Sequence, residues 1–165
     1  PLNPETGQGR TGPSITVGAQ AVEIEYDPVK YDYRLLKAAT VIDVGKLINP
    51  CAARGLLMGG MSMGLGLATR EEFLYNSQGK LENSSLRTYK LIHFGEQPEY
   101  LVEFLETEQI DAPFGARGLA EHGIIGIPAA FANAISIASQ ADLDILPISP
   151  ETIWKTKTGG KYDSL

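Results

Sequence analysis

Apolar and polar residues alternate near the start of the chain, where two glutamates separate Val22, Ile24 and Tyr26. An alternation with a period of two is typical of a strand that buries one face. The turn signal Asp27-Pro28 precedes a second, longer apolar run, so the two runs are predicted to pair as a hairpin. Four segments are predicted to be strands: residues 15–17, 21–26, 33–44 and 100–107.

Two segments carry the start signals of helices. Asn49 and Pro50 suit the cap and the first position of a helix that is predicted over about residues 51–73. Each glycine in a helix costs about 1 kcal/mol of stability relative to alanine. The several glycines of this predicted helix therefore indicate either close packing against another backbone or the approach of a flat cofactor. By themselves they favour packing. A second helix is predicted from around Pro128 to about Ser139. The glycines of the first helix are Gly55, Gly59, Gly60, Gly64 and Gly66.

Weaker signals complete the predicted organisation. Residues 1–13 contain three prolines and three glycines and are predicted to be a linker or loop. Residues 76–79 separate two short apolar runs, as in a hairpin, whereas residues 83–89 are polar and loop-like. Pro147 and Pro150 punctuate a C-terminal tail of short segments. The predicted fold class is α+β, in which mixed strands and hairpins pack against the glycine-rich helix and the helix of the C-terminal half.

Composition narrows the classes of partner. A net charge of −6 argues against a general nucleic-acid binder, which needs a basic face. The longest apolar run, residues 55–68, is too short and glycine-rich to span a bilayer, and residues 1–4 are too polar for a signal peptide. Cys51 is the single cysteine, so no internal disulfide can form, and this fits a reducing compartment such as the cytoplasm. The Cys51 side chain is interpreted as a packing residue. Because the first residue is not methionine, the 165 residues are interpreted as a piece of a longer polypeptide.

Several common site motifs are missing from the sequence. Cys51, His93 and His122 are not spaced as metal ligands, so no protein-ligated metal is expected. The glycines of residues 64–66 do not continue into a dinucleotide-binding fingerprint, because Thr69 stands where the third glycine belongs. The sequence contains neither a nucleophile elbow nor a phosphate-cradling P-loop.

The segment 112–123 has the most unusual composition. Gly115 and Gly118 permit a tight turn and the close approach of a ligand, and exposed N–H groups at such a turn can bind a phosphate or a pterin edge. Arg117 is either part of such a site or a surface charge. Glu121 is the one carboxylate of the segment. It is either a partner for the dipole of the following helix or a general base, and the residues alone favour the structural alternative.

Five stretches, taken in order, carry a family likeness. They are residues 17–28, residues 44–50 with the glycine helix at 59–66, residues 83–90, residues 115–121 with 128–130 and 133–135, and residues 146–151. Together they resemble the molybdenum-binding large subunit of the xanthine dehydrogenase and aldehyde oxidase family, the molybdenum hydroxylases. The fourth stretch is the most specific, and the likeness covers nearly the whole chain. It implies that residues 1–165 are a C-terminal fragment of the second molybdopterin-binding domain.

The resemblance implies an oxidoreductase that hydroxylates an electrophilic carbon. Its cofactor is molybdenum bound to molybdopterin or to molybdopterin cytosine dinucleotide, and iron–sulfur clusters and FAD lie on other domains or subunits. In this family a glutamate at the position of Glu121 is the general base that takes a proton from the oxygen nucleophile. The resemblance assigns cofactor contacts to the glycine-rich segment and the glycine helix: Gly115, Ala116, Arg117, Gly118, Met63 and Gly64. The implied partners are the remainder of the molybdenum subunit, the iron–sulfur and FAD subunits, and a small-molecule substrate.

The chain departs from the family pattern in two respects. Met63 stands where many members have glutamine, which resembles bacterial purine-hydroxylating members and favours a purine such as xanthine over a related N-heterocycle or an aldehyde. The other cofactor-binding segments and the iron–sulfur cysteines are absent from these 165 residues, so the chain alone is expected to be inactive. Arg87 and Glu82 are candidate substrate-pocket residues by position. The alternative is a non-catalytic assembly or interaction module derived from such a subunit.

Overall fold

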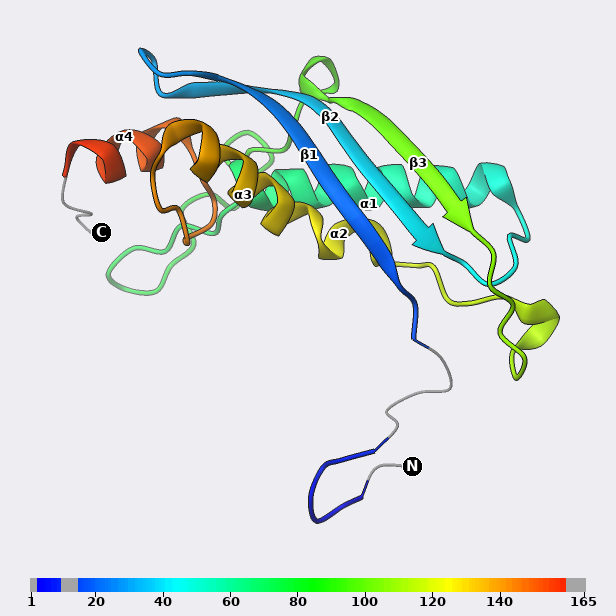
Figure 1. Cartoon of the computed structure of the whole chain (residues 1–165). Helices are drawn as coiled ribbons and strands as arrows, with labels where there is room; N and C mark the ends of the chain where they lie inside the picture. The colour runs from blue at the N-terminus through cyan, green and yellow to red at the C-terminus, as the bar shows by residue number, and fades with distance from the viewer. Residues whose placement is uncertain (1–2, 10–14, 160–165) are drawn as a thin grey trace.

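The computed structural model describes residues 3–9 and 15–159, in which a three-stranded sheet carries helices on one face (Figure 1). The strands are β1 (Gly18–Asp27), β2 (Asp32–Asp43) and β3 (Glu99–Leu105). β1 pairs antiparallel with β2, as the hairpin signal predicts, whereas β3 pairs parallel with β2. The sheet is therefore mixed, and the predicted α+β class is confirmed.

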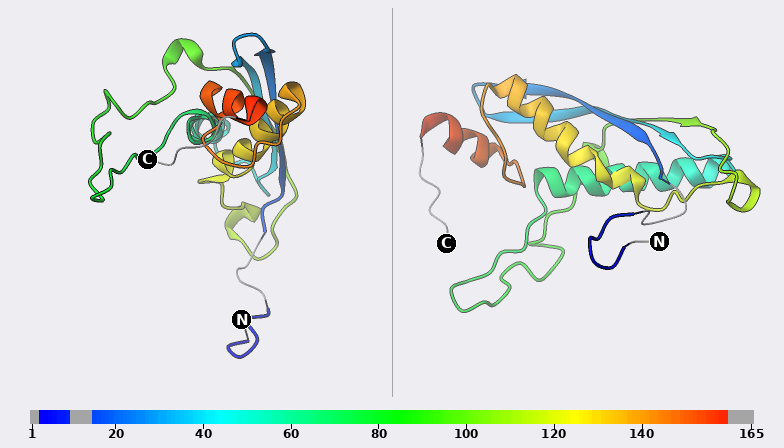
Figure 2. Two further views of the ribbon diagram at one scale, coloured as in Figure 1. Left: turned by 90° about the vertical axis from the view of Figure 1, so that its left-hand side faces the viewer. Right: turned by 60° about the horizontal axis from the view of Figure 1, so that its bottom comes forward.

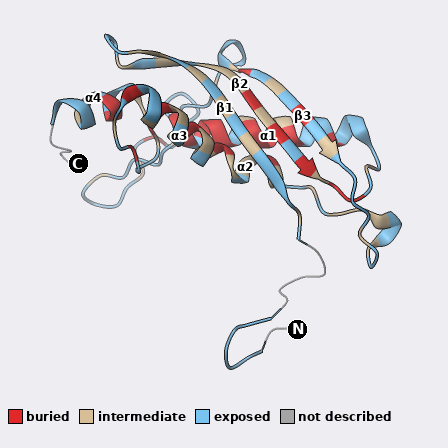
Figure 3. Cartoon of the chain, in the orientation of Figure 1, coloured by how far each residue is buried: buried red, intermediate tan, exposed pale blue. Residues whose placement is uncertain are grey.

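The helices form the second layer of the fold. They are α1 (Pro50–Thr69), α2 (His122–Ile125), α3 (Ile127–Ser139) and α4 (Pro150–Thr158), with short 3-10 turns η1 (Phe94–Glu96) and η2 (Pro113–Gly115). α1 connects the two parallel strands and lies beside α2 and α3 against the sheet, while α4 lies near the end of α3 (Figure 2). The buried residues lie along the sheet and the helices that face it (Figure 3). The core that they form includes Ala38, Ile42, Leu57, Met61, Leu65, Val102, Ile127, Phe131 and Ile135.

α1 and α2 meet in direct backbone contact, which explains some of the glycines of α1. A Cβ added at Gly60 would lie 2.9 Å from the Cα of Gly123, and one added at Gly64 would lie 3.2 Å from the Ile124 carbonyl oxygen. Gly59 is different, because it lies on the exposed face of α1 and an added Cβ would meet no atom within 4 Å. Packing therefore explains why positions 60 and 64 are glycine. No contact explains the glycine at position 59.

The predicted start of the first helix is confirmed, and two neighbouring predictions are wrong. Asn49 caps α1 by accepting a hydrogen bond from the Ala52 N–H at 3.0 Å. The helix ends at Thr69 and not at residue 73, because Arg70 leaves the helical conformation. Cys51 is exposed, since it lies in the first turn of α1 on the side away from the core.

Other boundaries also differ from prediction. Residues 15–17 precede β1 and form no strand of their own. The predicted hairpin around residues 76–79 contains one isolated bridge, between Tyr75 and Leu81. The predicted tail of short segments contains α4, because Ser149 accepts a hydrogen bond from a backbone N–H in the first turn, at 3.1 Å, and so caps a helix.

Residues 70–98 form an arm that extends from the C-terminal end of α1 (Figure 2). Asn83 closes the base of this arm: its Nδ2 donates to the Glu72 carbonyl oxygen at 2.6 Å, and its Oδ1 accepts from the Leu74 N–H at 2.9 Å. The loop predicted over residues 83–89 is confirmed, since it contains turns and no regular helix or strand.

One helical segment of the described residues, His122–Ser139, has the length and apolar composition of a helix that crosses a membrane. Gly126 divides this segment into α2 and α3. Its buried side chains, Phe131 and Ile135 among them, belong to the core shared with the sheet and α1. Core helices of this kind pass the same test of length and composition.

Candidate functional site

Residues 112–121 lead into α2 and are called the bend, with a first half at 112–117 and a second half at 118–121. The first half turns through η2, in which Phe114 and Gly115 have φ angles of 56° and 72°. Such left-handed angles are ordinary for glycine and uncommon for phenylalanine. The Phe114 side chain is exposed and lies outside the core.

The first half of the bend uses its backbone donors within the chain. Three successive N–H groups donate to carbonyl oxygens at 2.9–3.1 Å: Gly115 to Ala112, Ala116 to Pro113, and Arg117 to Val44. The last of these bonds attaches the bend to the residue that follows β2. These N–H groups are therefore already paired and are not free for a ligand.

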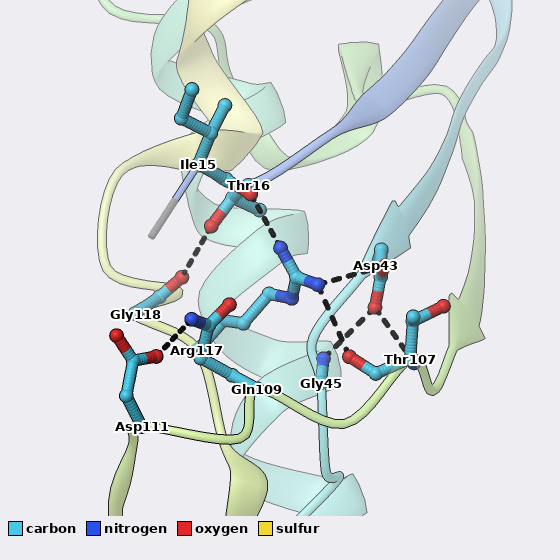
Figure 4. Close-up of polar contacts among 9 residues, drawn as sticks. All are labelled: Ile15, Thr16, Asp43, Gly45, Thr107, Gln109, Asp111, Arg117 and Gly118. Atoms are coloured by element: carbon cyan, nitrogen blue, oxygen red, sulfur yellow. Dashed lines mark hydrogen bonds and ion pairs between the residues drawn. The ribbon is translucent and has the colours of Figure 1, made fainter. Parts of the chain in front are cut away.

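The guanidinium of Arg117 joins three further segments (Figure 4). Its Nη1 donates to the Ile15 carbonyl oxygen at 2.5 Å and its Nη2 to the Thr107 carbonyl oxygen at 3.2 Å. Nη2 also lies 3.6 Å from Oδ2 of Asp43. The side chain is 13% exposed, so the surface-charge alternative is excluded. Its Nε atom is buried and has no hydrogen-bond partner among the residues that the structure describes.

Asp43 completes this junction from the end of β2. Its Oδ1 accepts the N–H groups of Gly45 at 2.9 Å and Thr107 at 3.0 Å. These two backbone donors, together with the nearby Arg117, hold the pKa of the Asp43 carboxyl below its usual value. The ends of β2 and β3 and the first half of the bend are thus fixed to one another.

The second half of the bend is bonded much less. Within the described part of the chain, the N–H groups of residues 118–121 donate no hydrogen bond, and the exposed Glu121 carboxylate accepts none. The Gly118 carbonyl oxygen accepts a bond from Oγ1 of Thr16 at 3.4 Å, and a Cβ added at Gly118 would meet no atom within 4 Å. This half therefore presents backbone donors and a carboxylate to its surroundings.

A cavity of about 250 Å³ lies between the bend and the first turns of α1. Most of its lining is apolar, and the bend and α1 both contribute: Val44, Leu47, Ala53, Leu56, Ala116 and Leu119. The cavity is smaller than the pockets that enclose whole drug-sized ligands, which reach about 300–1,000 Å³. It suits one ring system or one edge of a larger ligand.

Gln20 of β1 holds the two ends of α2. Its Oε1 accepts the Gly126 N–H at 2.6 Å, and its Nε2 donates to the carbonyl oxygens of Gly123 at 2.9 Å and His122 at 3.3 Å. On the other side, Gly123 packs against Gly60 of α1. The backbone that follows the bend is therefore fixed from both the sheet and α1.

Sequence reasoning did not single out Gln20, Asp43 or Thr107. Gln20 has a local signal, because it lies in phase with Val22 and Ile24 and so places a polar side chain on the inward-facing side of β1. Asp43 has only a partial local signal, because the Gly45 N–H lies two residues along the chain, whereas Thr107 and the Arg117 guanidinium come from the end of β3 and from the bend.

The structure brings together some of the predicted site residues. Residues 115–121 share the bend, whereas Gly64 is buried against α2 and Met63 is exposed on another face of α1. Arg87 and Glu82 are exposed on the arm. The arm leaves the C-terminal end of α1 and the cavity lies at its N-terminal end, a separation of about 30 Å for a helix of 20 residues. No cluster of His, Cys, Asp or Glu suited to a metal ion occurs in residues 3–9 and 15–159.

Known proteins resemble this chain over most of its length. The molybdopterin cofactor-binding domain family matches residues 1–98. The chain is 40% identical over 86% of its length to the 6-hydroxypseudooxynicotine dehydrogenase complex subunit gamma of Paenarthrobacter nicotinovorans. It is 29% identical over 84% of its length to the putative xanthine dehydrogenase molybdenum-binding subunit of Escherichia coli. It covers 18% of each of these relatives. Quinoline 2-oxidoreductase from Pseudomonas putida 86 superposes with a TM-score of 0.80 at 28% identity, over 86% of this chain and 18% of that chain.

Proposed function

The chain belongs to the molybdopterin cofactor-binding domain family, within the molybdenum hydroxylases, and we propose that it is the part of a molybdenum-binding subunit that contributes the catalytic base. It spans about a fifth of the length of the relatives it matches. Several large apolar side chains, such as Phe94, Ile110 and Phe114, are almost fully exposed. Exposed apolar surface of this extent supports an interface with the remainder of the subunit. A cytoplasmic location stays a prediction from the single cysteine.

The bend has the chemistry to hold one edge of a molybdopterin. The N–H groups of residues 118–121, which donate no hydrogen bond within the described residues, are donors for the polar edge of a pterin or for a phosphate. Ala116 and Leu119 provide an apolar wall at the cavity. The buried Nε of Arg117, which has no hydrogen-bond partner among the described residues, is a further donor beside it. We assign the second half of the bend to cofactor contact, while Gly115 and Arg117 maintain its shape. Met63 and Gly64 stay predicted contacts.

Glu121 is assigned the role of general base. When bound, the molybdenum cofactor supplies the two-electron oxidation that accompanies hydroxylation, and iron–sulfur clusters and FAD elsewhere in the enzyme carry the electrons away. Glu121 accepts a proton at a carboxylate oxygen. The observation that carries this proposal is that Glu121 follows a bend fixed by Arg117 and Asp43, yet is itself exposed and accepts no hydrogen bond within the described residues. Its oxygens are therefore available for proton transfer.

The substrate class that we propose is an aromatic N-heterocycle. Relatives named for quinoline, for 6-hydroxypseudooxynicotine and for xanthine support this class. Met63 favours a purine within it, and an aldehyde is the competing class. Product analysis of the complete enzyme with xanthine, hypoxanthine, nicotinate, quinoline and a simple aldehyde distinguishes these substrates. Turnover of the aldehyde alone would contradict the N-heterocycle proposal.

The role of Glu121 is tested by Glu121→Gln in the complete enzyme. Loss of a general base predicts a fall in turnover of about 10²- to 10⁴-fold, with molybdenum content, measured by mass spectrometry, unchanged. Glu103→Gln is the matched control, because Glu103 is an exposed glutamate on β3 and should leave turnover unchanged. Near-normal turnover of Glu121→Gln would instead favour the alternative of a non-catalytic assembly module.

A further inference from the structure

One amide side chain controls the backbone that leads out of Glu121. Gln20 bonds to three backbone groups that lie 102–106 residues later in the chain, all of them between residues 122 and 126. A backbone N–H only donates and a carbonyl oxygen only accepts. The bonding therefore determines the orientation of the amide, with Oε1 toward Gly126 and Nε2 toward Gly123. A side chain at this position needs both a donor and an acceptor. Glutamate lacks the donor, and methionine has no donor and only a weakly accepting sulfur.

α2 depends on such contacts, because it has four residues and is too short to be stable by itself. The contact between Gly60 and Gly123 limits how closely α2 approaches α1. Gly64 makes a second close contact, with the Ile124 carbonyl oxygen, so α1 supports α2 from one side by packing. Gln20 supplies hydrogen bonds from the sheet to the backbone at both ends of α2. Gly126 is matched to this arrangement, since an added Cβ would lie 2.6 Å from Oε1 of Gln20.

The location of Gln20 suits a residue that affects catalysis by positioning another residue. It lies on the inward-facing side of β1 and is half-buried. Its polar contacts within the described residues are all with the backbone around α2, and it is not part of the cavity lining. Resting on the proposed role of Glu121, we propose that Gln20 is a positioning residue for catalysis. By fixing the backbone from His122 to Gly126, it holds the Glu121 carboxylate in the orientation needed for proton transfer.

The test uses the complete enzyme and the substrate of the panel above that gives the highest turnover. In single-turnover reduction experiments, Gln20→Met should lower the rate constant of enzyme reduction about 10- to 100-fold, the range expected for a misplaced catalytic group. The substrate Kd and the reduction amplitude per molybdenum should stay within twofold of wild type. A merely structural role would lower the amplitude and leave the rate constant of the remaining active sites unchanged. That result would overturn the proposal.

Gln20→Glu is the second variant, because it keeps the shape and the acceptor but replaces the donor with an oxygen that repels two carbonyl groups. Its rate constant should fall at least as far as that of Gln20→Met, and a rate constant within twofold of wild type would contradict the proposal. Glu23→Gln is the control on the same strand, since Glu23 makes an exposed ion pair with Lys37 at 3.0 Å. This variant should behave as wild type.

A readout that needs no substrate is amide hydrogen exchange in the complete subunit. The Gly126 amide should exchange faster in Gln20→Met, whereas Gln20→Glu retains its acceptor and should keep this amide protected. Equal exchange of Gly126 in Gln20→Met and wild type would show that the bond does not hold α2, and would overturn the proposal.

Combination with Glu121→Gln separates the two proposals. If Gln20 acts through Glu121, adding Gln20→Met to Glu121→Gln causes no further loss of rate. A full additional loss would show that Gln20 acts by another route and would reject the positioning role alone. Wild-type reduction by Glu121→Gln would reject the proposed function, and the positioning role with it.

Discussion

Arg117 and Glu121 lie four residues apart on one bend and have opposite surroundings. Arg117 is mostly buried and bonds to the segment before β1, to the connection after β3 and to the end of β2. Glu121 is exposed and accepts no hydrogen bond from the residues that the structure describes. The charged group that stabilises the fold, Arg117, is therefore in the first half of the bend. The charged group that remains available for chemistry is in the second half.

The difference separates structural residues from site residues within a single motif. A group whose bonding capacity is satisfied by its own chain contributes to stability, and it has little left to offer a ligand. By this criterion the backbone donors of residues 115–117 maintain the bend, and those of residues 118–121 remain available for the proposed contact with the cofactor. Family likeness alone does not make this distinction, because it covers both halves equally.

The substitution Arg117→Met in the complete subunit is the strongest test of this difference between Arg117 and Glu121. The variant loses two hydrogen bonds and leaves Asp43 without its cation. We expect the free energy of local opening to fall by about 2–4 kcal/mol. Amide exchange at Gly45 and Thr107, which donate to Asp43, should then be about 30- to 800-fold faster.

Glu121→Gln is the control for this measurement, since its side chain has no bond in the described residues to lose. Exchange at Gly45 and Thr107 should stay within twofold of wild type. Faster exchange in Glu121→Gln than in Arg117→Met would mean that the stabilising charge and the available charge have been assigned the wrong way round.

The fold was largely predictable where the signal is local. The alternation at Val22, Ile24 and Tyr26 and the cap at Asn49 both depend on neighbours in sequence, and both predictions are confirmed. The functions of Gly60 and Gln20 depend on backbone about 60 and 100 residues away. No local pattern specifies such a partner. A sequence therefore predicts the elements of this domain better than it predicts the contacts that position its site.

The same limit applies to the burial of site residues. Arg117 lies between alanine and glycine and Glu121 between alanine and histidine, and neither pattern indicates which of the two charges is buried. Burial of Arg117 follows from the junction of the two strand ends, which the pairing of β2 with β3 brings together. Long-range geometry, rather than residue type, decides which of the two charges is satisfied.

A second prediction concerns the contact that positions the second half of the bend. Gly60→Ala places a Cβ 2.9 Å from the Cα of Gly123 and should cost about 1–3 kcal/mol. Gly59→Ala, one residue earlier on the exposed face of α1, should instead favour the helix by up to about 1 kcal/mol. Exchange of the Ile124 amide in the complete subunit measures both effects, because this amide bonds to the Glu121 carbonyl oxygen at 3.2 Å.

We expect faster exchange of Ile124 in Gly60→Ala and unchanged or slower exchange in Gly59→Ala. Unchanged exchange in Gly60→Ala would show that the glycine contact does not determine the position of α2. Faster exchange in both variants would show that the exposed face of α1 is also tightly packed in the complete subunit.

The smallest expected effect is the pH dependence of the stability that Asp43 contributes at its junction with Arg117. The pKa of Asp43 is lowered in the folded protein, mainly by the Gly45 and Thr107 N–H groups. A lowered pKa means that folding favours the charged form, so this carboxylate contributes stability above its ordinary pKa of about 3.9. The contribution disappears as the pH falls through the lowered value. Asp43→Asn keeps an oxygen that accepts both bonds and removes the charge that faces Arg117.

The complete subunit should therefore unfold at a lower temperature in Asp43→Asn than in wild type at pH 7, and the difference should shrink as the pH falls below about 4. Unfolding midpoints between pH 3 and pH 7 measure it, with Glu25→Gln as a control that removes an exposed ion pair with Arg34 at 2.8 Å and should change little. A constant difference across this range would mean that Asp43 acts through hydrogen bonds and shape alone. The charge of the junction would then contribute nothing, and bonding rather than electrostatics would distinguish the two halves of the bend.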